Sequence, residues 1–220
     1  MQIRWGRYSL VLLMPFFISF CSSPARGIIV FCAGDSLTAA AYPHFLQRMF
    51  NREGIRCRVL NFGRNGFSSG EYRRFLEESG ERLKKERPDY ILLQLGTNDV
   101  RVDGDHAPTE AFTANMEAIL EMFRAFRDRA GNPSRVLLGT ILPIPENTPL
   151  PFSPESARRV AAEINPAIRA LAAARGLPLV DNHALFADRR GLLPGVHPSR
   201  EGYLRIAENW FGALKSLIKR

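Results

Sequence analysis

The chain has 220 residues, of which 45% are hydrophobic and 24% charged, and its formal net charge is +8. This is enough apolar sequence to bury a full core, and no internal repeat or low-complexity tract divides it, so we expect one domain of enzyme size. The excess of Lys and Arg is interleaved with acidic residues on predicted helices and accompanies no nucleic-acid-binding motif, so a nucleic-acid partner is not expected. Attraction to anionic lipid or envelope polymer is compatible with this charge.

The N-terminal 20 residues have the pattern of an export signal. Arg4 and Arg7 precede an apolar stretch, Ser9–Phe20, that is interrupted by Pro15. This stretch is too short for a comfortable membrane span, so it predicts a signal peptide over residues 1–20. We therefore expect an exported protein of the bacterial cell envelope.

Residues 18–23, Ile-Ser-Phe-Cys-Ser-Ser, resemble a bacterial lipobox, in which the cysteine becomes the acylated first residue of a lipoprotein. The resemblance implies lipidation of Cys21, a membrane anchor at the N-terminus and a short tether over residues 21–26. Phe20 departs from the small residue expected before the cysteine. Cleavage after Ala25, which would give a periplasmic or secreted protein, and an uncleaved anchor are the alternatives.

The rest of the chain alternates short apolar runs with amphipathic segments. Strands are predicted at 27–32, 56–62, 89–95, 135–141 and 177–181, and helices at 43–52, 70–86, 109–129, 154–175 and 200–219. This alternation is typical of a parallel sheet with helices on both faces. We therefore expect residues 27–220 to form an α/β three-layer sandwich with five parallel strands in the flavodoxin-like order 2-1-3-4-5.

Two further features fit this fold. The prolines of residues 143–151 exclude a regular helix or central strand, so we expect a stiff loop there that shapes the substrate side of a site. Cys32 and Cys57 would lie at opposite ends of neighbouring parallel strands, too far apart for a disulfide. We expect both to be free thiols.

Polar residues follow the first three strands. Ser36 comes directly after the first strand, Gly63–Gly66 after the second and Gly96–Asp99 after the third. In this strand order the carboxyl ends of the three strands meet at the switch point, where such sheets bind ligands. The sequence therefore predicts that these segments share one crevice around Ser36.

This crevice can supply the groups that acyl transfer requires, namely a nucleophile, a base and donors to the developing oxyanion. Ser36 offers the hydroxyl, Gly66 a closely approaching backbone N–H, and Asn98 a carboxamide donor. His197, just before the last predicted helix, would be the base. In isolation, each has a structural interpretation: Ser36 as a helix N-cap or phosphate-binding residue, Gly66 and Asn98 as turn residues, and His197 as a surface residue.

Other candidates have weaker support. Ser68 lies in Gly66–Gly70, which fits the G-x-S-x-G nucleophile elbow, but too few strands precede it. His44, His106 and His183 suit surface or packing roles. Asp103, Asp105 and His106 lack a recognised metal-ligand spacing, so no metal is expected, and with no G-x-G-x-x-G after the first strand, no cofactor is expected.

Four blocks, in order, resemble the GDSL, or SGNH, hydrolases: Gly34–Leu37, Asn61–Gly66, Gly96–Asp99 and Gly195–Pro198. Their joint order and spacing across residues 34–198 are far more specific than any one tetrapeptide. The resemblance implies an esterase- or lipase-like fold.

For the site residues, the same resemblance implies that Ser36 is the nucleophile and His197 the base. It also implies an oxyanion hole formed by the Ser36 N–H, the Gly66 N–H and Asn98.

The chain departs from the family at the triad acid. An aspartate commonly stands three residues before the histidine, and here that position is Pro194. The carboxylate normally holds the imidazole tautomer and stabilises the imidazolium. The Pro194 backbone carbonyl, Asp188 and Asp181 are the candidates to orient His197, so the site is expected to work as a Ser–His dyad or with a substitute acid.

The leading hypothesis is a serine esterase that cleaves carboxylic ester or thioester bonds of a small-molecule, glycan or lipid substrate through an acyl-enzyme. Two alternatives stay open. One is a catalytically weak or inactive envelope protein that binds glycan or lipid. The observation behind this alternative is that Pro194 stands where the triad acid is usual. The other is an acyltransferase that uses the same serine.

Overall fold

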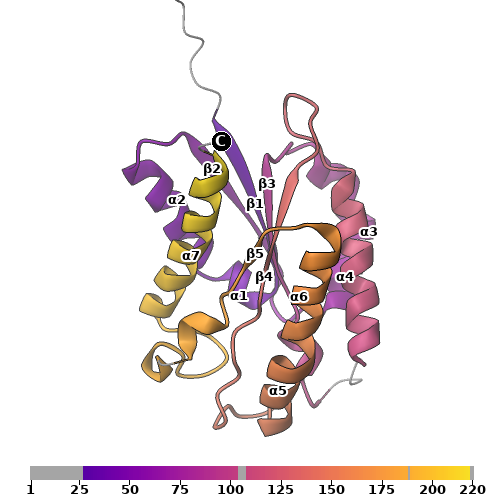
Figure 1. The fold of residues 1–220 in the computed structure, drawn as a ribbon, viewed down its shortest axis with the longest axis vertical. Coiled ribbons are helices and arrows are strands. Elements are labelled where there is room, and N and C mark those ends of the chain that lie inside the picture. The colour runs from indigo at the N-terminus through magenta and orange to yellow at the C-terminus, as the bar shows by residue number, and fades with distance from the viewer. Residues whose placement is uncertain (1–26, 104–107, 188, 219–220) are drawn as a thin grey trace, which may run out of the picture.

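The computed structural model describes residues 27–103, 108–187 and 189–218, and its strands form one sheet (Figure 1). The five strands pair in parallel in the order β2-β1-β3-β4-β5. They are β1 (Ile28–Gly34), β2 (Cys57–Gly63), β3 (Tyr90–Gln94), β4 (Arg135–Gly139) and β5 (Leu179–Val180). The predicted fold class and strand order are confirmed.

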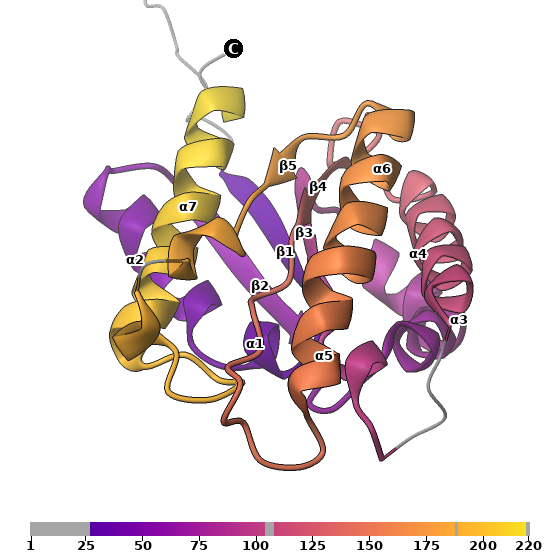
Figure 2. The same ribbon diagram turned by 60° about the horizontal axis from the view of Figure 1, so that its bottom comes forward.

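Helices connect the strands and cover both faces of the sheet, as Figure 2 shows. They are α1 (Ser36–Ala39), α2 (Tyr42–Arg52), α3 (Ser69–Lys84), α4 (Thr109–Arg124), α5 (Pro154–Arg159), α6 (Asn165–Arg175) and α7 (Arg200–Ile218). α2 and α7 lie against one face, and α3, α4 and α6 against the other.

The two cores follow from the alternation of side chains along β1. Phe31 and Ala33 point into the core beneath α3, α4 and α6, whereas Val30 and Cys32 point into the core beneath α2 and α7. All four side chains are fully buried, as expected for a central parallel strand covered on both sides. β1 is therefore held rigidly, and its carboxyl end is a fixed platform for whatever follows it.

The register aligns the ends of the three strands around this platform. Gly34 of β1 is level with Gly63 of β2 and with Gln94 of β3. The segments that leave these strands start at one edge of the sheet, as the sequence predicts. Cys32 lies opposite Asn61 while Cys57 lies opposite Ile28, and both cysteines are free, so the prediction of no disulfide between them is confirmed.

The predicted helix over 154–175 is present but is not regular. Five π-helical residues, Val160–Ile164, separate α5 from α6. Pro166 stands in the first turn of α6 and has no N–H to donate, which favours a widened turn before it. The Asn165 side chain accepts from Ile141 N at 2.9 Å and donates to Ile141 O at 3.1 Å, which fixes the chain just after β4.

Several predicted elements run past the observed ends, among them β3, β4 and α3 by one or two residues, and the difference is largest for α4 and β5. α4 ends at Arg124 rather than at residue 129, and β5 comprises only Leu179–Val180 because Pro178 cannot donate to the ladder. Within the residues that the structure describes, no helix has the length and apolar character needed to cross a membrane. The predicted signal peptide and Cys21 lie outside the described residues.

Candidate active site

Ser36 is presented by a tight turn between β1 and α1. Gly34 has φ of +155°, and a Cβ there would lie 2.1 Å from the Gln94 carbonyl oxygen, so the turn requires glycine. Asp35 caps α1 by accepting a hydrogen bond from Leu37 N at 2.9 Å. Asp35 therefore stabilises the turn, and Ser36 is the first residue of the helix rather than its cap.

Asp35 is a fully buried carboxyl group beneath the site. Burial raises its pKa to about 6, although the Leu37 N–H and the Thr97 hydroxyl favour its charged form. The carboxyl group therefore titrates far above its ordinary range, while it holds the turn that positions Ser36.

The segment after β2 is tied to the nucleophile turn. Arg64 N donates to Gly34 O at 2.8 Å, which joins the two segments through their backbones. Gly66 has φ of +77° and is exposed, so its amide lies at the surface of the cleft in a conformation that favours glycine. The segments that follow β1 and β2 thus place Ser36 and Gly66 in the lining of the same cleft.

The segment after β3 carries Asn98 in a short 3₁₀ turn, Asn98–Val100. Asn98 Nδ2 donates to Phe67 O at 3.0 Å, which orients the carboxamide and leaves its second N–H for another acceptor. The next residue, Asp99, is buried and accepts from Ser69 Oγ at 2.5 Å and from Ser69 N at 2.9 Å. Asp99 therefore anchors this turn to the start of α3, a role that the sequence analysis missed.

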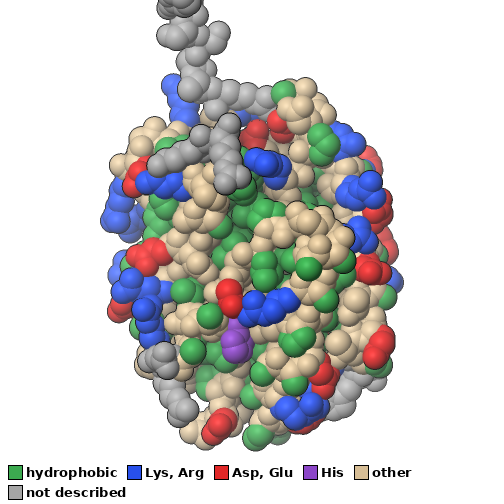
Figure 3. Space-filling model, in the orientation of Figure 1, with side chains coloured by type: hydrophobic (Ala, Val, Ile, Leu, Met, Phe, Trp, Pro, Cys, Tyr) green, Lys and Arg blue, Asp and Glu red, His purple; other side chains and the backbone are tan. Residues whose placement is uncertain are grey.

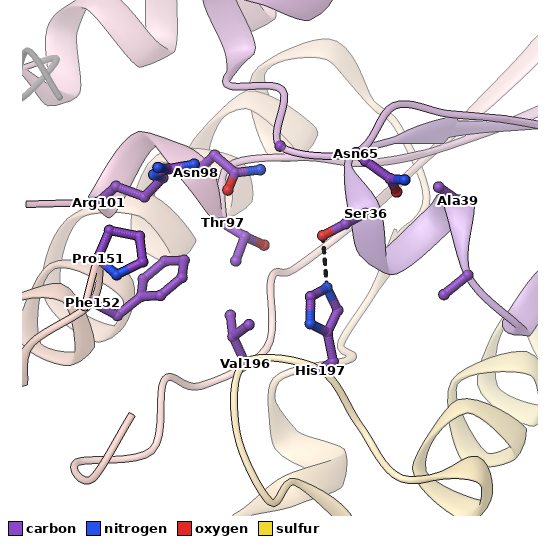
Figure 4. Close-up of a pocket in the computed structure, with 12 residues that line it drawn as sticks. Ser36, Ala39, Asn65, Thr97, Asn98, Arg101, Pro151, Phe152, Val196 and His197 are labelled. Atoms are coloured by element: carbon purple, nitrogen blue, oxygen red, sulfur yellow. Dashed lines mark hydrogen bonds between the residues drawn. The ribbon is translucent and has the colours of Figure 1, made fainter. Parts of the chain in front are cut away.

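His197 reaches Ser36 from the segment before α7. His197 Nε2 lies 2.9 Å from Ser36 Oγ, and the hydroxyl donates when this nitrogen carries no proton (Figure 4). The two residues are 161 positions apart in the chain, so only the fold brings them together. The imidazole is exposed to solvent.

These residues line one open cleft of about 630 Å³ at the carboxyl edge of the sheet. Its walls contain Ser36, Gly66, Asn98 and His197, together with Ala39, Ala40, Asn65, Thr97, Arg101, Pro151, Phe152 and Val196. The predicted convergence of the four motif residues is therefore observed, while their chemical roles stay predictions.

The far wall of the cleft contains the end of the proline-rich loop, which was expected there, and Arg101, which was not. Pro151 and Phe152 come from the end of the proline-rich loop, which was predicted to shape this side (Figure 4). Arg101 was not predicted. Its guanidinium donates to both carboxylate oxygens of Asp103, at 2.9 and 2.7 Å. A short-range Arg-x-Asp spacing after the asparagine block is the signal that could have indicated it.

The structure does not pair His197 with a side-chain acid among the residues it describes. Asp181 is engaged elsewhere: its Oδ2 accepts from Arg169 at 2.7 Å, and its Oδ1 accepts from Thr140 Oγ1 at 2.9 Å. Asp181 is therefore no partner of His197 here, because Arg169 of α6 and Thr140, the residue after β4, supply its contacts. Pro194 is exposed in the preceding segment, and Asp188 lies outside the described residues.

The competing site residues have structural roles. Ser68 Oγ donates to Glu71 Oε2 at 2.8 Å in a capping box that starts α3, so its hydroxyl is occupied. His44 is exposed on α2, and burial lowers the pKa of the half-buried His183. The described residues contain no group of three or more potential metal ligands, while Asp105 and His106 lie outside them.

Comparisons with known proteins agree with this geometry. A model of the GDSL-like lipase/acylhydrolase family matches residues 32–205. The chain is 27% identical over 148 residues to a multidomain esterase of Ruminococcus flavefaciens, covering 64% of this chain and 17% of that protein. It is 26% identical over 221 positions to an acetylxylan esterase of Xylanibacter ruminicola, covering 86% of this chain and 43% of that protein. The chain spans less than half the length of these curated relatives.

Solved structures share the fold at low sequence identity. A carbohydrate acetylesterase family member from Sinorhizobium meliloti aligns with a TM-score of 0.72 and 18% identity, over 88% of this chain and all of that one. An acetylxylan esterase from Geobacillus stearothermophilus aligns with a TM-score of 0.68 and 19% identity, over 85% of this chain and 94% of that one. Because the family model spans most of the domain and the four predicted motifs meet in its cleft, the chain belongs to the GDSL-like lipase/acylhydrolase family of ester-bond hydrolases.

Proposed function

We propose that the protein is a serine esterase that cleaves carboxylic esters through an acyl-enzyme on Ser36. The observation that carries the proposal is the 2.9 Å approach of His197 Nε2 to Ser36 Oγ inside the cleft. A serine hydroxyl is a weak nucleophile until an adjacent base accepts its proton, and this geometry supplies that base.

The reaction then follows from the positions of the groups. Ser36 Oγ attacks the ester carbonyl carbon while its proton moves to His197 Nε2. The tetrahedral intermediate collapses, the C–O bond to the alcohol breaks, and the alcohol leaves with the proton from Nε2. Water, activated by the same imidazole, attacks the acyl-enzyme and releases the carboxylic acid and free Ser36.

Three donors are available for the oxyanion. They are the Ser36 N–H at the start of α1, the Gly66 N–H, and the second N–H of Asn98 Nδ2. The hydrogen bond from Nδ2 to Phe67 O supports this role because it orients the carboxamide before substrate binds. Oriented donors of this kind stabilise the transition state without reorganisation.

For the substrate, we propose acetyl esters of carbohydrates. The support comes from the relatives, two of which are named as an acetylxylan esterase and a carbohydrate acetylesterase family member. The open shape of the cleft, with polar residues beside Pro151 and Phe152, suits a sugar unit that stays partly in solvent.

The test is hydrolysis of a p-nitrophenyl ester series of increasing acyl length, followed by acetate release from acetylated xylo-oligosaccharides. The proposal predicts the highest kcat/KM for acetyl and acetate release that Ser36→Ala abolishes. A rise in kcat/KM with acyl length would reject the acetyl assignment but keep the esterase. Ester hydrolysis that survives in Ser36→Ala would reject the mechanism.

A second candidate is a binding protein with little turnover. The observation that favours it is that no carboxylate of the described residues contacts His197 and that Pro194 occupies the usual acid position. Binding of carbohydrate without release of acid or transfer of an acyl group would support this candidate. Transfer to a sugar hydroxyl instead of water would identify an acyltransferase with the same serine.

We also propose export and lipidation of Cys21. The lipobox-like residues 18–23 support this proposal. Intact-mass analysis of the protein from bacterial membranes should show a diacylated N-terminal cysteine, and Cys21→Ser should lose it. An N-terminus at Arg26 would show cleavage after Ala25 instead.

A further inference from the structure

The amino edge of the sheet, opposite the cleft, concentrates positive charge. Segments 52–58, 84–89 and 127–135 lead into β2, β3 and β4, and they hold nine Lys or Arg residues against four Asp or Glu. We refer to these three segments as the basic edge. Figure 3 shows Lys and Arg side chains around the upper end of the molecule, where these strands begin.

The acids of the basic edge are already engaged by the protein. Glu86 pairs with Arg58 at 2.7 Å, and Glu53 pairs with Lys215 at 2.6 Å. Asp89 Oδ2 accepts from Ile29 N at 2.7 Å, and Asp128 Oδ1 accepts from Ala130 N at 2.7 Å. Even with all four acids ionised, the basic edge keeps a formal surplus of five positive charges.

Several of the cations have no carboxylate partner among the described residues. Arg56, Lys85 and Arg87 are exposed, and Arg87 donates only to the backbone carbonyls of Asp128 and Arg129. Lys85 is the C-cap of α3, where the helix dipole favours a cation, but Arg56 and Arg87 lie beyond the ends of α2 and α3. They line a shallow groove of about 500 Å³.

The N-terminal segment enters the domain at this groove. Gly27 is part of its lining, and the Arg129 guanidinium donates to Gly27 O. Residues 1–26, with the predicted export signal and Cys21, therefore join the domain at the basic edge. β1 then runs its seven residues, about 23 Å, from this edge to the turn that presents Ser36 (Figure 1).

We propose that the basic edge docks on the anionic phospholipid headgroups of a membrane, so that the cleft faces away from the lipid. A membrane attachment through residues 1–26 places this edge nearest the surface, where each Lys or Arg strengthens binding to anionic lipid. The two acyl chains of a diacylated Cys21 would hold the chain at the membrane, and the basic edge would then fix which side of the domain faces the lipid. The inference does not depend on catalysis by Ser36.

The experiment compares partition of the full chain into vesicles of phosphatidylcholine alone and of phosphatidylcholine mixed with phosphatidylglycerol. The apolar N-terminal stretch contributes to both, so the ratio of the two partition coefficients isolates the headgroup charge. The variant replaces Arg56, Lys85 and Arg87 by Gln. The matched control replaces Arg74, Arg158 and Arg205, surface cations of α3, α5 and α7, by Gln.

For the wild-type protein, we expect the partition coefficient into phosphatidylglycerol-containing vesicles, divided by that into phosphatidylcholine vesicles, to exceed one. Added salt should lower this ratio. The basic-edge variant should lower it roughly 100-fold, about fivefold per cation, while the control keeps the wild-type ratio. Unchanged far-ultraviolet circular dichroism shows that both variants fold. An equal loss in the two variants, a wild-type ratio of one, or binding of polyglutamate in preference to anionic vesicles would overturn the proposal.

Discussion

Two serines at the same edge of the sheet show how the fold separates a reactive hydroxyl from a structural one. Ser36 and Ser68 each stand at the start of a helix that follows a parallel strand. At α1 the cap is Asp35, whose carboxylate accepts from Leu37 N. At α3 the cap is Ser68 itself, with its hydroxyl held by Glu71.

The comparison shows that the residue before the serine determines whether the serine hydroxyl is free or is used to cap the helix. Because Asp35 supplies the cap, Ser36 Oγ is left for His197 in the cleft. Ser68 has no such neighbour, so its hydroxyl satisfies the helix terminus. A serine that follows a parallel strand can therefore have a hydroxyl free to react, as at Ser36, or one that caps a helix, as at Ser68. Five substitutions test this comparison.

The largest effect is expected for Ser36→Ala. Removal of the nucleophile should lower kcat/KM for a p-nitrophenyl ester by at least about 10⁴-fold, and His197→Ala should lose nearly as much because the two groups act as a unit. Steady-state kinetics measure the loss, and thermal unfolding should be unchanged. Wild-type turnover in either variant would contradict the assignment.

A smaller loss is expected for Asn98→Ala. The missing oxyanion donor should lower kcat by about 10²–10³-fold with little change in KM, because the interaction forms in the transition state. The hydrogen bond to Phe67 O is lost as well, so unfolding measurements must accompany the kinetics. If KM rises while kcat stays constant, Asn98 binds substrate rather than the oxyanion.

Asp35→Asn tests the buried cap through its pH dependence. The pKa of Asp35 is about 6 in the folded protein, above its ordinary value of 3.8, so folding favours the protonated carboxyl group. This stabilisation is present at low pH and is lost as pH rises from about 4 to about 6. Asn keeps the cap without the charge, so the unfolding free energy of the variant, relative to wild type, should rise by about 2–3 kcal/mol across this window.

Urea denaturation of both proteins at several pH values measures this difference. The subtraction removes the contributions of titrating groups that do not interact with Asp35; Asp99 does interact with it, so the difference includes their coupling. A difference that stays flat between pH 4 and 7 would show that Asp35 keeps an ordinary pKa.

The smallest effect is expected for Ser68→Ala. Loss of this cap should lower the unfolding free energy by about 1 kcal/mol, and kcat/KM should stay at the wild-type value. Calorimetry and ester hydrolysis measure the two quantities. A loss of activity beyond the loss of folded protein would mean that the G-x-S-x-G serine takes part in the reaction.

Much of this site could be predicted because it depends on topology. The apolar runs define parallel strands, and the strand order places three carboxyl ends together. Gly34 marks a turn that packs closely against β3, whereas Gly66 is required only for its positive φ, because a Cβ there would meet no atom within 4 Å. The identity of the cap at α1 could not be predicted in the same way. Asp35 and Ser36 are equally good N-cap residues by type, and only the register of the helix assigns the role to Asp35.

Contacts between surface groups that are distant in the chain could not be predicted from the sequence either. Asp181 was a candidate partner of His197, but its carboxylate accepts a hydrogen bond from Arg169 of α6 instead. Arg101, by contrast, is held by a local pair with Asp103, which the Arg-x-Asp spacing could have indicated. The π-helical residues before α6 depend on how Pro166 is accommodated within a helix, which periodicity does not reveal.

The most direct test of the central claim is covalent labelling with a fluorophosphonate, followed by intact-mass and peptide analysis. Wild type and Ser68→Ala should each gain a single phosphonyl group on Ser36, and Ser36→Ala should gain none. Labelling of Ser36→Ala, or modification of Ser68 in the wild-type protein, would contradict the assignment of Ser36 as the reactive serine.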